Sequence, residues 1–259
     1  MKSIDLNCDM GEAFGRYHLG DEEIIRLITS ANIACGWHGG DPLVMDRTVK
    51  MAVENHVAVG AHPGLPDLLG FGRRAMACTP QEIRSYVTYQ IGALKAFCTA
   101  HHTRLHHVKP HGALYLMAVD NPDIAHAIAE AVAAVAPDLH YIALAGAKGQ
   151  TMARAAETLG LTIGYEAFPD RAYTASGTLQ SRQEPGAVIQ DPCHVAERAL
   201  QMVLDECVTA NDGTIIPLQA DTLCVHGDTP AAVVLAKDIR YALEKEGVVL
   251  SSMQMASRE

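Results

Sequence analysis

The chain has 259 residues, of which 49% are apolar and 19% charged, and its formal net charge is −10. These values exclude two classes of protein. A nucleic-acid-binding protein needs clustered cations to meet phosphates, and a solvated acidic tail lacks the apolar residues for a core. Because a length of about 250 residues is typical of a single α/β barrel, we expect one globular domain over residues 1–259.

The first residues and the cysteines indicate the cellular location of the protein. From Met1 to Met10 the chain carries acids and alternates polar with apolar residues, which is unlike a secretory signal. No apolar run approaches the roughly 20 residues that cross a bilayer. The 7 cysteines are scattered, without a C-x-x-C pair, and are expected to be reduced thiols. We therefore expect a cytoplasmic protein with no membrane contact.

Short apolar segments rich in β-branched residues are predicted to be strands. In chain order they cover residues 4–8, 32–35, 57–61, 105–109, 141–145, 162–166 and 222–225. Helices are predicted between them, and a capping residue followed by proline marks five of their starts. These starts are Asp41-Pro42, Thr79-Pro80, Asn121-Pro122, Asp191-Pro192 and Thr229-Pro230. Two further helices are predicted at residues 21–30 and 148–159, the second ending at Gly160.

Strand alternates with helix about seven times, which implies a parallel sheet with right-handed crossovers. The pattern predicts a TIM-barrel-like single-domain β/α barrel with seven parallel strands, one short of eight, of the glycoside hydrolase/deacetylase type. An open doubly wound sheet is the alternative, because counting alternations does not show whether the sheet closes. No linker divides the chain, and residues 170–190 are expected to form a long loop.

Polar and ionisable residues gather just beyond the carboxyl ends of the predicted strands. Those in or after six of the seven strands are Asn7, Asp9 and Glu12, then His38, His62, Lys109 and His111, and then Glu166, Asp170, Arg171, His226 and Asp228. In a parallel barrel these ends open onto one face, where active sites are built. We expect these side chains to line a single cleft.

Metal binding is the weaker interpretation of the histidines. Asp9, His38 and His62 would supply three ligands of a catalytic metal from neighbouring strands, but no H-E-x-x-H or H-x-H spacing supports this. Whether a metal is present is therefore left open. The histidine-rich run at residues 101–107 is interpreted as a solvated, partly packed turn on the far side of the barrel from the cleft.

The strand-end residues lie within long motifs. The clearest are DLNCDMGE at 5–12, NIACGWHGGDP at 32–42, GAHP at 60–63, PDLLGFGRR at 66–74, VKPHGALY at 108–115, EAFPDRAY at 166–173 and CVHGDT at 224–229. In this order they resemble the LamB/YcsF family, and the resemblance spans residues 5 to about 247. Departures such as Trp37 and Gly39, where the family usually has Phe and Ala, leave every ionisable group in place.

The resemblance implies a β/α-barrel subunit of an ATP-dependent 5-oxoprolinase, which opens the lactam ring of 5-oxo-L-proline to L-glutamate. It implies two partner proteins, of the PxpB and PxpC type. ATP with Mg²⁺ is the implied cofactor, bound either by this chain, which lacks P-loop spacing, or by a partner. Opening a lactam needs an activated carbonyl, a positioned water and a proton for the departing amine.

For this reaction we hypothesise roles for the strand-end residues. Asp9 or Glu166 would activate water, and His62 or His111 would pass protons. Lys109 and either Arg73 or Arg171 would hold the substrate carboxylate or a transferred phosphate, which fixed cations suit. The remaining expected substrate-binding residues are Asn7, Glu12, His38, Asp170, His226 and Asp228.

Two other functions remain alternatives. A metal-dependent amidohydrolase or deacetylase would also use Asp and His at barrel strand ends, and would require a bound metal. A non-enzymatic ligand-binding subunit that regulates a partner would show affinity without turnover. The alanine-rich helix around residues 124–136 permits packing against the barrel or against a second copy of the chain, so a homo-oligomer is also open.

Overall fold

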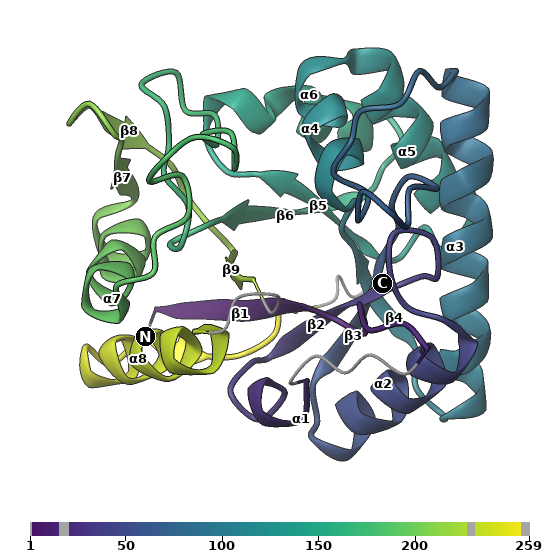
Figure 1. The fold of residues 1–259 in the computed structure, drawn as a ribbon, viewed down its shortest axis with the longest axis horizontal. Helices are drawn as coiled ribbons and strands as arrows, with labels where there is room; N and C mark the ends of the chain where they lie inside the picture. Colours follow the sequence, from purple (N-terminus) through teal and green to yellow (C-terminus); the bar gives the residue numbers. More distant parts are fainter. Residues whose placement is uncertain (1, 16–20, 227–230, 255–259) are drawn as a thin grey trace.

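The computed structural model describes residues 2–15, 21–226 and 231–254, and its main feature is a closed barrel of 7 parallel strands (Figure 1). The barrel strands are β1 (Ser3–Met10), β2 (Ser30–Ala34), β3 (Ala58–His62), β4 (Leu105–Val108), β5 (His140–Leu144), β6 (Thr162–Ala167) and β9 (Thr222–Val225). Asn7 of β1 aligns with Ser30 of β2 on one side and with Cys224 of β9 on the other, which closes the ring. The predicted barrel is confirmed, and the open-sheet alternative is wrong.

Helices cover the outside of the barrel (Figure 1). They are α1 (Asp21–Ile24), α2 (Pro42–Glu54), α3 (Pro80–Ala100), α4 (Gly112–Asp120), α5 (Pro122–Val135), α6 (Gln150–Glu157), α7 (Pro192–Leu200) and α8 (Ala232–Lys245). A 3₁₀ turn at Ala147–Gly149 precedes α6, and a π turn at Gln201–Asp205 follows α7. Helix α5 packs against α3, α4 and α6, so much of its alanine surface is covered within this chain. Among the described residues, none of the helices has the length and hydrophobicity needed to cross a membrane.

Four of the predicted proline-marked starts are confirmed, because α2, α3, α5 and α7 each begin at the proline. At Asp41 the side chain accepts from the backbone N–H groups of Leu43 and Val44. Thr79 and Glu82 form the reciprocal capping box that begins α3. The fifth predicted start, at Thr229-Pro230, lies outside the described residues.

Some predictions of local structure are wrong or incomplete. The helix predicted at residues 21–30 ends at Ile24, because Thr29 donates its N–H to the Leu6 carbonyl and draws the chain into the sheet. Helix α4 was not predicted. The same holds for the antiparallel pair β7 (Cys207–Thr209) and β8 (Ile215–Pro217), and for β10 (Val249–Leu250), which pairs with the start of β1.

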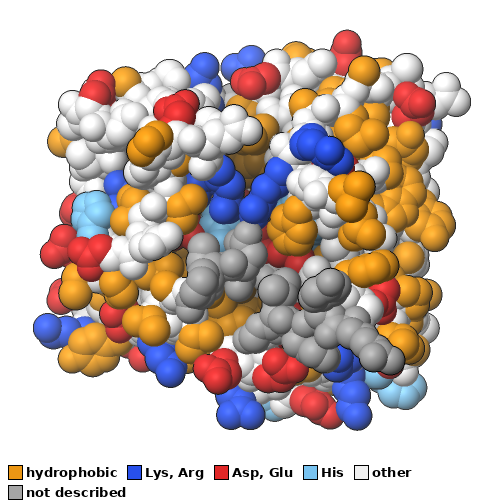
Figure 2. Space-filling model, viewed as in Figure 1, with side chains coloured by type: hydrophobic (Ala, Val, Ile, Leu, Met, Phe, Trp, Pro, Cys, Tyr) orange, Lys and Arg blue, Asp and Glu red, His pale blue; other side chains and the backbone are white. Residues whose placement is uncertain are grey.

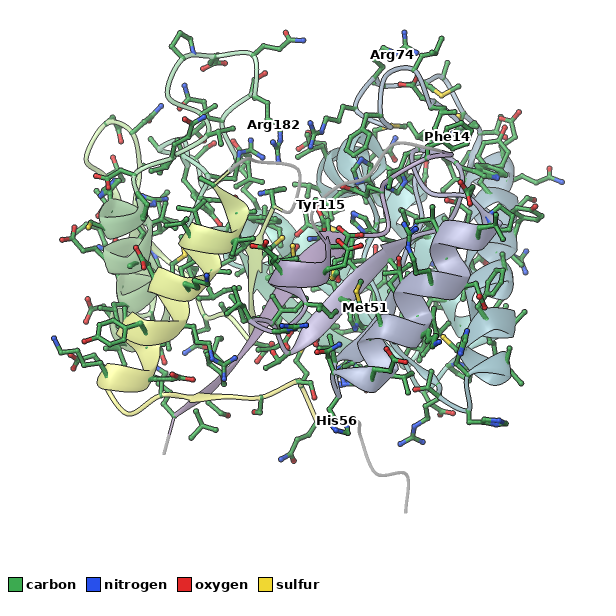
Figure 3. All side chains as sticks on the ribbon, turned by 60° about the horizontal axis from the view of Figure 1, so that its bottom comes forward. Phe14, Met51, His56, Arg74, Tyr115 and Arg182 are labelled. Carbon is green, nitrogen blue, oxygen red and sulfur yellow. The ribbon has the colours of Figure 1, made fainter. Side chains whose placement is uncertain are left out.

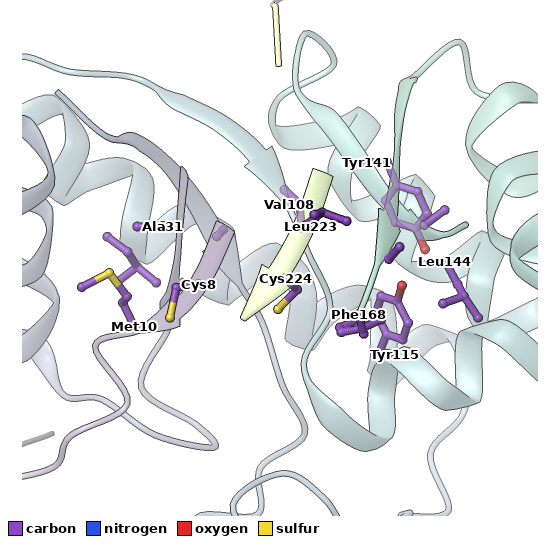
Figure 4. Packing of buried hydrophobic residues seen from close by; sticks show 14 of the residues in the cluster. Cys8, Met10, Ala31, Val108, Tyr115, Tyr141, Leu144, Phe168, Leu223 and Cys224 are labelled. Atoms are coloured by element: carbon purple, nitrogen blue, oxygen red, sulfur yellow. The ribbon is translucent and has the colours of Figure 1, made fainter. Parts of the chain in front are cut away.

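Two kinds of side chain alternate along the barrel strands. On β1, Leu6 and Met10 are fully buried apolar residues, whereas Asn7 and Asp9 point to the opposite face, into the barrel. Figure 4 shows buried apolar side chains from several elements, with Tyr115, Tyr141, Leu144 and Phe168 gathered on one side and Leu223 and Cys224 on β9. Each such buried large side chain contributes roughly 1.5–3 kcal/mol, so the apolar shell stabilises a barrel whose interior is polar.

The amino-terminal end of the barrel is covered by residues 251–254. There the ring nitrogens of His106 and His140 donate to the carbonyls of Met253 and Gln254, at 2.6 and 3.0 Å. His106 and His107 are buried residues of strand β4. The predicted strand from Leu105 is confirmed, and the interpretation of residues 101–107 as a solvated, partly packed turn applies only to the residues before it, because His106 and His107 are buried in β4.

Candidate active site

The predicted site residues lie at the carboxyl end of the barrel. Figure 3 places Phe14, Arg74 and Arg182 at this end and His56 at the opposite one. On this side Figure 2 shows a central hollow with Lys and Arg side chains on its rim and a histidine visible inside. The predicted residues that are buried here are Asn7, Asp9, Glu12, His38, His62, Lys109, His111, Glu166, Asp170, Arg171 and His226. Arg73 is exposed, and Asp228 lies outside the described residues.

Lys109 occupies the centre of the barrel. Its Nζ lies 2.9 Å from Asp9 Oδ1, 2.9 Å from Glu166 Oε1 and 3.0 Å from Cys224 Sγ. Burial lowers the pKa of Lys109, but Asp9 and the other two neighbours outweigh burial and raise it well above its ordinary value. The lysine therefore remains a buried cation between two carboxylates, which come from β1 and β6, the strands on either side of β9.

The two carboxylates differ in their tendency to ionise. Burial opposes ionisation of Asp9, but His62 and Lys109 hold its pKa well below the usual range. Burial raises the pKa of Glu166, although Lys109 acts against it. Glu166 is fully buried and its Oε2 has no hydrogen-bond partner among the described residues. Asp9, which retains slight exposure, is therefore better placed to meet a substrate than Glu166.

A layer of amides beneath Lys109 holds these carboxylates in place. Asn7 donates to Glu166 at 3.0 Å, and Asn32 donates to Asp9 at 2.9 Å. Asn32 in turn accepts from His107 Nε2 at 2.7 Å. An ideal Cβ on Gly60 would lie 2.0 Å from that nitrogen, so only glycine leaves room for the imidazole. Asn32 and His107 were not predicted as supporting residues, although Asn32 lies inside one of the long motifs.

Two histidines meet beside Asp9. His62 donates from Nδ1 to the Lys109 carbonyl, and His111 donates from Nε2 to the Phe71 carbonyl, both at 2.8 Å. Their remaining nitrogens lie 2.9 Å apart, and His62 Nε2 is 3.4 Å from Asp9 Oδ2. Because each ring has one nitrogen committed to a carbonyl, the pair faces the site through a single nitrogen per residue.

Glu12 and His38 complete this group. Glu12 Oε1 lies 3.3 Å from His38 Nε2 and 3.4 Å from His111 Nδ1. The rings of His38 and His111 stack with their centroids 3.7 Å apart. Burial lowers the pKa of both imidazoles well below the ordinary value, so both favour the neutral form.

The loop that follows β3 packs directly onto these histidines. An ideal Cβ on Gly64 would lie 2.4 Å from His38 Nδ1, and one on Gly72 would lie 2.6 Å from His38 Cβ. Asp67 and Arg74 form an ion pair within the loop, with Arg74 Nε 2.9 Å from Asp67 Oδ2. This ion pair and the absence of side chains at the two glycines let the backbone lie flat against the imidazoles.

Asp170 and His226 form a hydrogen-bonded dyad across the barrel from the loop. His226 donates from Nδ1 to Asp170 Oδ2 at 2.8 Å, and its ring stacks on Phe168. Burial acts to raise the pKa of Asp170, but His226 holds it below the usual value. A ring nitrogen of His226 lies within 4.8 Å of an Asp9 oxygen and of Cys224 Sγ. An aspartate that fixes the tautomer of a histidine is a general arrangement for proton transfer.

The predicted arginines lie at the rim or in a loop. Arg73 stands 4.9 Å over the Phe71 ring. Arg171 donates to the backbone carbonyls of Gln180 and Ala187, so its guanidinium holds the 171–188 loop. Burial and the nearby Arg182 lower the pKa of Arg171 to about 10. The structure thus places Arg171 as a buried part of the loop, not as a cation reaching into the hollow.

Two groups of buried side chains could hold a metal, among the residues that are described. One comprises Glu12, His38, His62 and His111, and the other Asp9, Cys224 and His226. The ligand set predicted from the sequence, Asp9 with His38 and His62, is therefore divided between two groups. The reason is that Asp9 Oδ1 binds Lys109, whereas His38 lies against Glu12.

Comparison with known proteins agrees with this architecture. Residues 4–258 match the LamB/YcsF family. This chain belongs to the LamB/YcsF family. It is 54% identical over 246 residues to the A subunit of 5-oxoprolinase from Pyrococcus abyssi, covering 95% of each chain. It is 51% identical over 258 residues to the A subunit of 5-oxoprolinase from Geobacillus thermodenitrificans, covering 100% of both.

Solved structures show the same fold. A lactam utilization protein from Thermus thermophilus is 49% identical, with a TM-score of 0.91 over 97% of this chain and 100% of that one. A family 4 carbohydrate esterase from Streptomyces lividans has a TM-score of 0.51 at 9% identity, over 97% and 92% of the two chains. The second likeness concerns the fold alone. It agrees with the predicted single-domain β/α barrel.

Proposed function

We propose that this chain is the A subunit of an ATP-dependent 5-oxoprolinase, which opens the lactam ring of 5-oxo-L-proline to give L-glutamate. The observation that carries the proposal is the identity of 54% and 51%, over nearly the whole chain, to two relatives that are named for this activity. The site agrees with it, because a buried ammonium, several carboxylates and the Asp170–His226 dyad gather at the carboxyl end of the barrel.

The chemistry explains why such a site is required. A five-membered lactam is a resonance-stabilised amide, and its nitrogen is a poor leaving group. Transfer of a phosphoryl group from ATP to the amide oxygen would activate the ring carbon, releasing ADP. Water then adds to that carbon, and the C–N bond breaks as the nitrogen accepts a proton, which leaves an acyl phosphate. A second water hydrolyses the acyl phosphate to the carboxylate of glutamate and free phosphate. The residues must therefore orient water, move one proton and stabilise negative charge on oxygen.

We assign the proton transfer to His226. It would take the proton from the attacking water and return it to the ring nitrogen, while Asp170 keeps its Nδ1–H oriented. This differs from the sequence hypothesis of His62 or His111, because each of those rings donates to a carbonyl through one nitrogen and faces the other ring with its second nitrogen. Asp9, whose low pKa keeps it ionised, would accept a hydrogen bond from the water. Lys109 would hold Asp9 in that orientation.

The remaining roles concern the rim and the partners. Arg73, exposed beside Phe71, would meet the substrate carboxylate or the transferred phosphate. The relatives are each named as one component of a multi-subunit enzyme, which supports a complex, and we propose partners of the PxpB and PxpC type. All 7 cysteines are free thiols, which supports a reducing, cytoplasmic location. Titration of the isolated chain with ATP and Mg²⁺ tests whether the nucleotide binds here or on a partner.

The decisive experiment is glutamate release from 5-oxo-L-proline and ATP, measured for the purified chain with and without the two partner proteins. We expect glutamate and ADP to appear in equal amounts only when all components are present. Asp9→Asn should abolish turnover without unfolding the barrel, because asparagine preserves the shape of the side chain. Asp46→Asn, a change on the exposed face of α2, is the matched control and should remain active. An active, folded Asp9→Asn enzyme would remove Asp9 from the mechanism, and absence of glutamate in the full mixture would refute the proposed function.

A further inference from the structure

The facing nitrogens of His62 and His111 need a cation between them. Carbonyl oxygens only accept, so the hydrogen bonds to Lys109 and Phe71 place a hydrogen on His62 Nδ1 and on His111 Nε2. In the neutral rings, His62 Nε2 and His111 Nδ1 then present lone pairs to each other at 2.9 Å. Two lone pairs at this separation repel unless a proton or a metal ion lies between them.

The carboxylates around the pair distinguish a metal ion from a proton. Glu12 Oε1 is 3.4 Å from His111 Nδ1, and Asp9 Oδ2 is 3.4 Å from His62 Nε2. Such separations are long for a hydrogen bond. In a tetrahedral metal site with metal–ligand bonds of about 2.0–2.1 Å, however, two ligand atoms lie about 3.3–3.4 Å apart. The two imidazole nitrogens would need to separate by only about 0.4 Å to reach the same edge. A shared proton would lie between the two nitrogens alone, whereas a metal ion would also draw on the two oxygens at 3.4 Å.

The surroundings also fit a metal site. Each of the two rings is oriented by a backbone carbonyl through its other nitrogen, as is usual for metal-bound histidine. His38 lies against Glu12 and stacks on His111, so it helps to hold both of these side chains in position. In the other cluster, by contrast, the Lys109 ammonium already lies against Asp9 and Cys224, so a cation is in place there.

We propose that Glu12, His62 and His111 bind one divalent cation of the zinc class, with Asp9 Oδ2 at the edge of its coordination shell. Two imidazoles and a carboxylate favour a transition metal over Mg²⁺ or Ca²⁺, which prefer oxygen ligands. Three protein ligands leave a position for substrate or water, as in catalytic sites. Binding of the ion is independent of the reaction, but its role rests on the proposed function. As a Lewis acid it would stabilise the negative charge that develops on oxygen when water adds to the ring carbon.

The test measures metal on the full-length chain. Protein purified without chelator is analysed for metal by mass spectrometry, then stripped and titrated with Co²⁺, whose visible absorption reports imidazole and carboxylate ligands. We expect about one equivalent of Co²⁺ per chain. His111→Ala should weaken binding by about 100-fold or more, whereas His126→Ala, an exposed histidine on α5, should bind as the wild type does.

Two results would overturn the inference. One is a folded wild-type chain that gives no cobalt spectrum, with imidazole nitrogen resonances showing a proton shared by His62 and His111. The other is equal affinity in the His111→Ala and His126→Ala variants. If His111→Ala fails to fold by circular dichroism, Glu12→Gln serves in its place and should also weaken binding.

The activity assay separates this inference from the proposed function. A metal-loaded chain that releases no glutamate with its partners would refute the proposed function and leave the metal site standing. Full activity of the stripped chain would refute the role of the ion in catalysis and leave the 5-oxoprolinase assignment standing.

Discussion

The charge balance around Lys109 makes a quantitative prediction. Lys109 is 3% exposed and lies 2.9 Å from both Asp9 and Glu166. Lys109→Met keeps the length of the side chain but leaves two buried carboxylates without their cation. Breaking a buried ion pair in this way costs about 3–5 kcal/mol. For a chain of this size, each kcal/mol shifts the midpoint of thermal unfolding by about 2–4 °C, so we expect a loss of about 6–20 °C.

The pH dependence of the variant has a definite sign. Without Lys109, the largest influence that lowers the pKa of Glu166 is gone, and burial raises that pKa further. A carboxyl group whose pKa is higher in the folded than in the unfolded state takes up a proton first in the folded state. The stability of Lys109→Met should therefore increase as the pH falls from 7 toward 5, by up to about 1.4 kcal/mol per pH unit for each such group.

A double-mutant cycle provides the control. Glu166→Gln in the Lys109→Met background removes one of the two uncompensated charges, so the double variant should be less destabilised than the sum of the single variants. Unfolding by urea, followed by circular dichroism at pH 7 and at pH 5, measures all four proteins. Additivity within about 0.5 kcal/mol, or a Lys109→Met variant that loses stability as the pH falls, would refute the reasoning.

Further predictions concern the dyad and the glycines. Asp170→Asn should lower kcat for 5-oxo-L-proline by about 10²–10⁴-fold, because His226 loses the carboxylate that orients it. Thermal stability should change little. An unchanged kcat would contradict the assignment of proton transfer to His226. Gly149→Ala should destabilise the chain by about 3 kcal/mol, since its Cβ would lie 1.6 Å from the Leu144 carbonyl oxygen. Gly92→Ala is the matched control, because Gly92 lies in helix α3 and an ideal Cβ there has nothing within 4 Å. It should stabilise the chain by about 0.5–1 kcal/mol, measured by the same urea titration.

Local signals in the sequence were sufficient to predict most of the framework. Proline after a capping residue marked the starts of α2 and α3, where the cap hydrogen bonds are present. The apolar segments marked all seven barrel strands within two residues at either end. These signals are local, because caps and strands depend on residues close together in the chain.

The supporting contacts of the site could not be predicted, because they depend on the register between strands. Asn32 reaches Asp9 and His107 only because β1, β2 and β4 bring them to one level inside the barrel. No local pattern indicated that the Arg171 guanidinium would turn back to its own loop. The division of the predicted metal ligands has the same origin, because Lys109 arrives from β4 and binds Asp9.

The contact between Gly60 and His107 bears on how this barrel can change during evolution. A side chain at position 60 would overlap the imidazole at 107, so position 60 is not free to vary while His107 is present. A lineage that exchanged His107 for a smaller residue would make room for alanine at 60, but it would also lose the donor that holds Asn32. A side chain at position 60 should therefore occur only together with a smaller residue at 107, and an aligned set of descendants would show this as covariation between the two positions in the polar interior of the barrel.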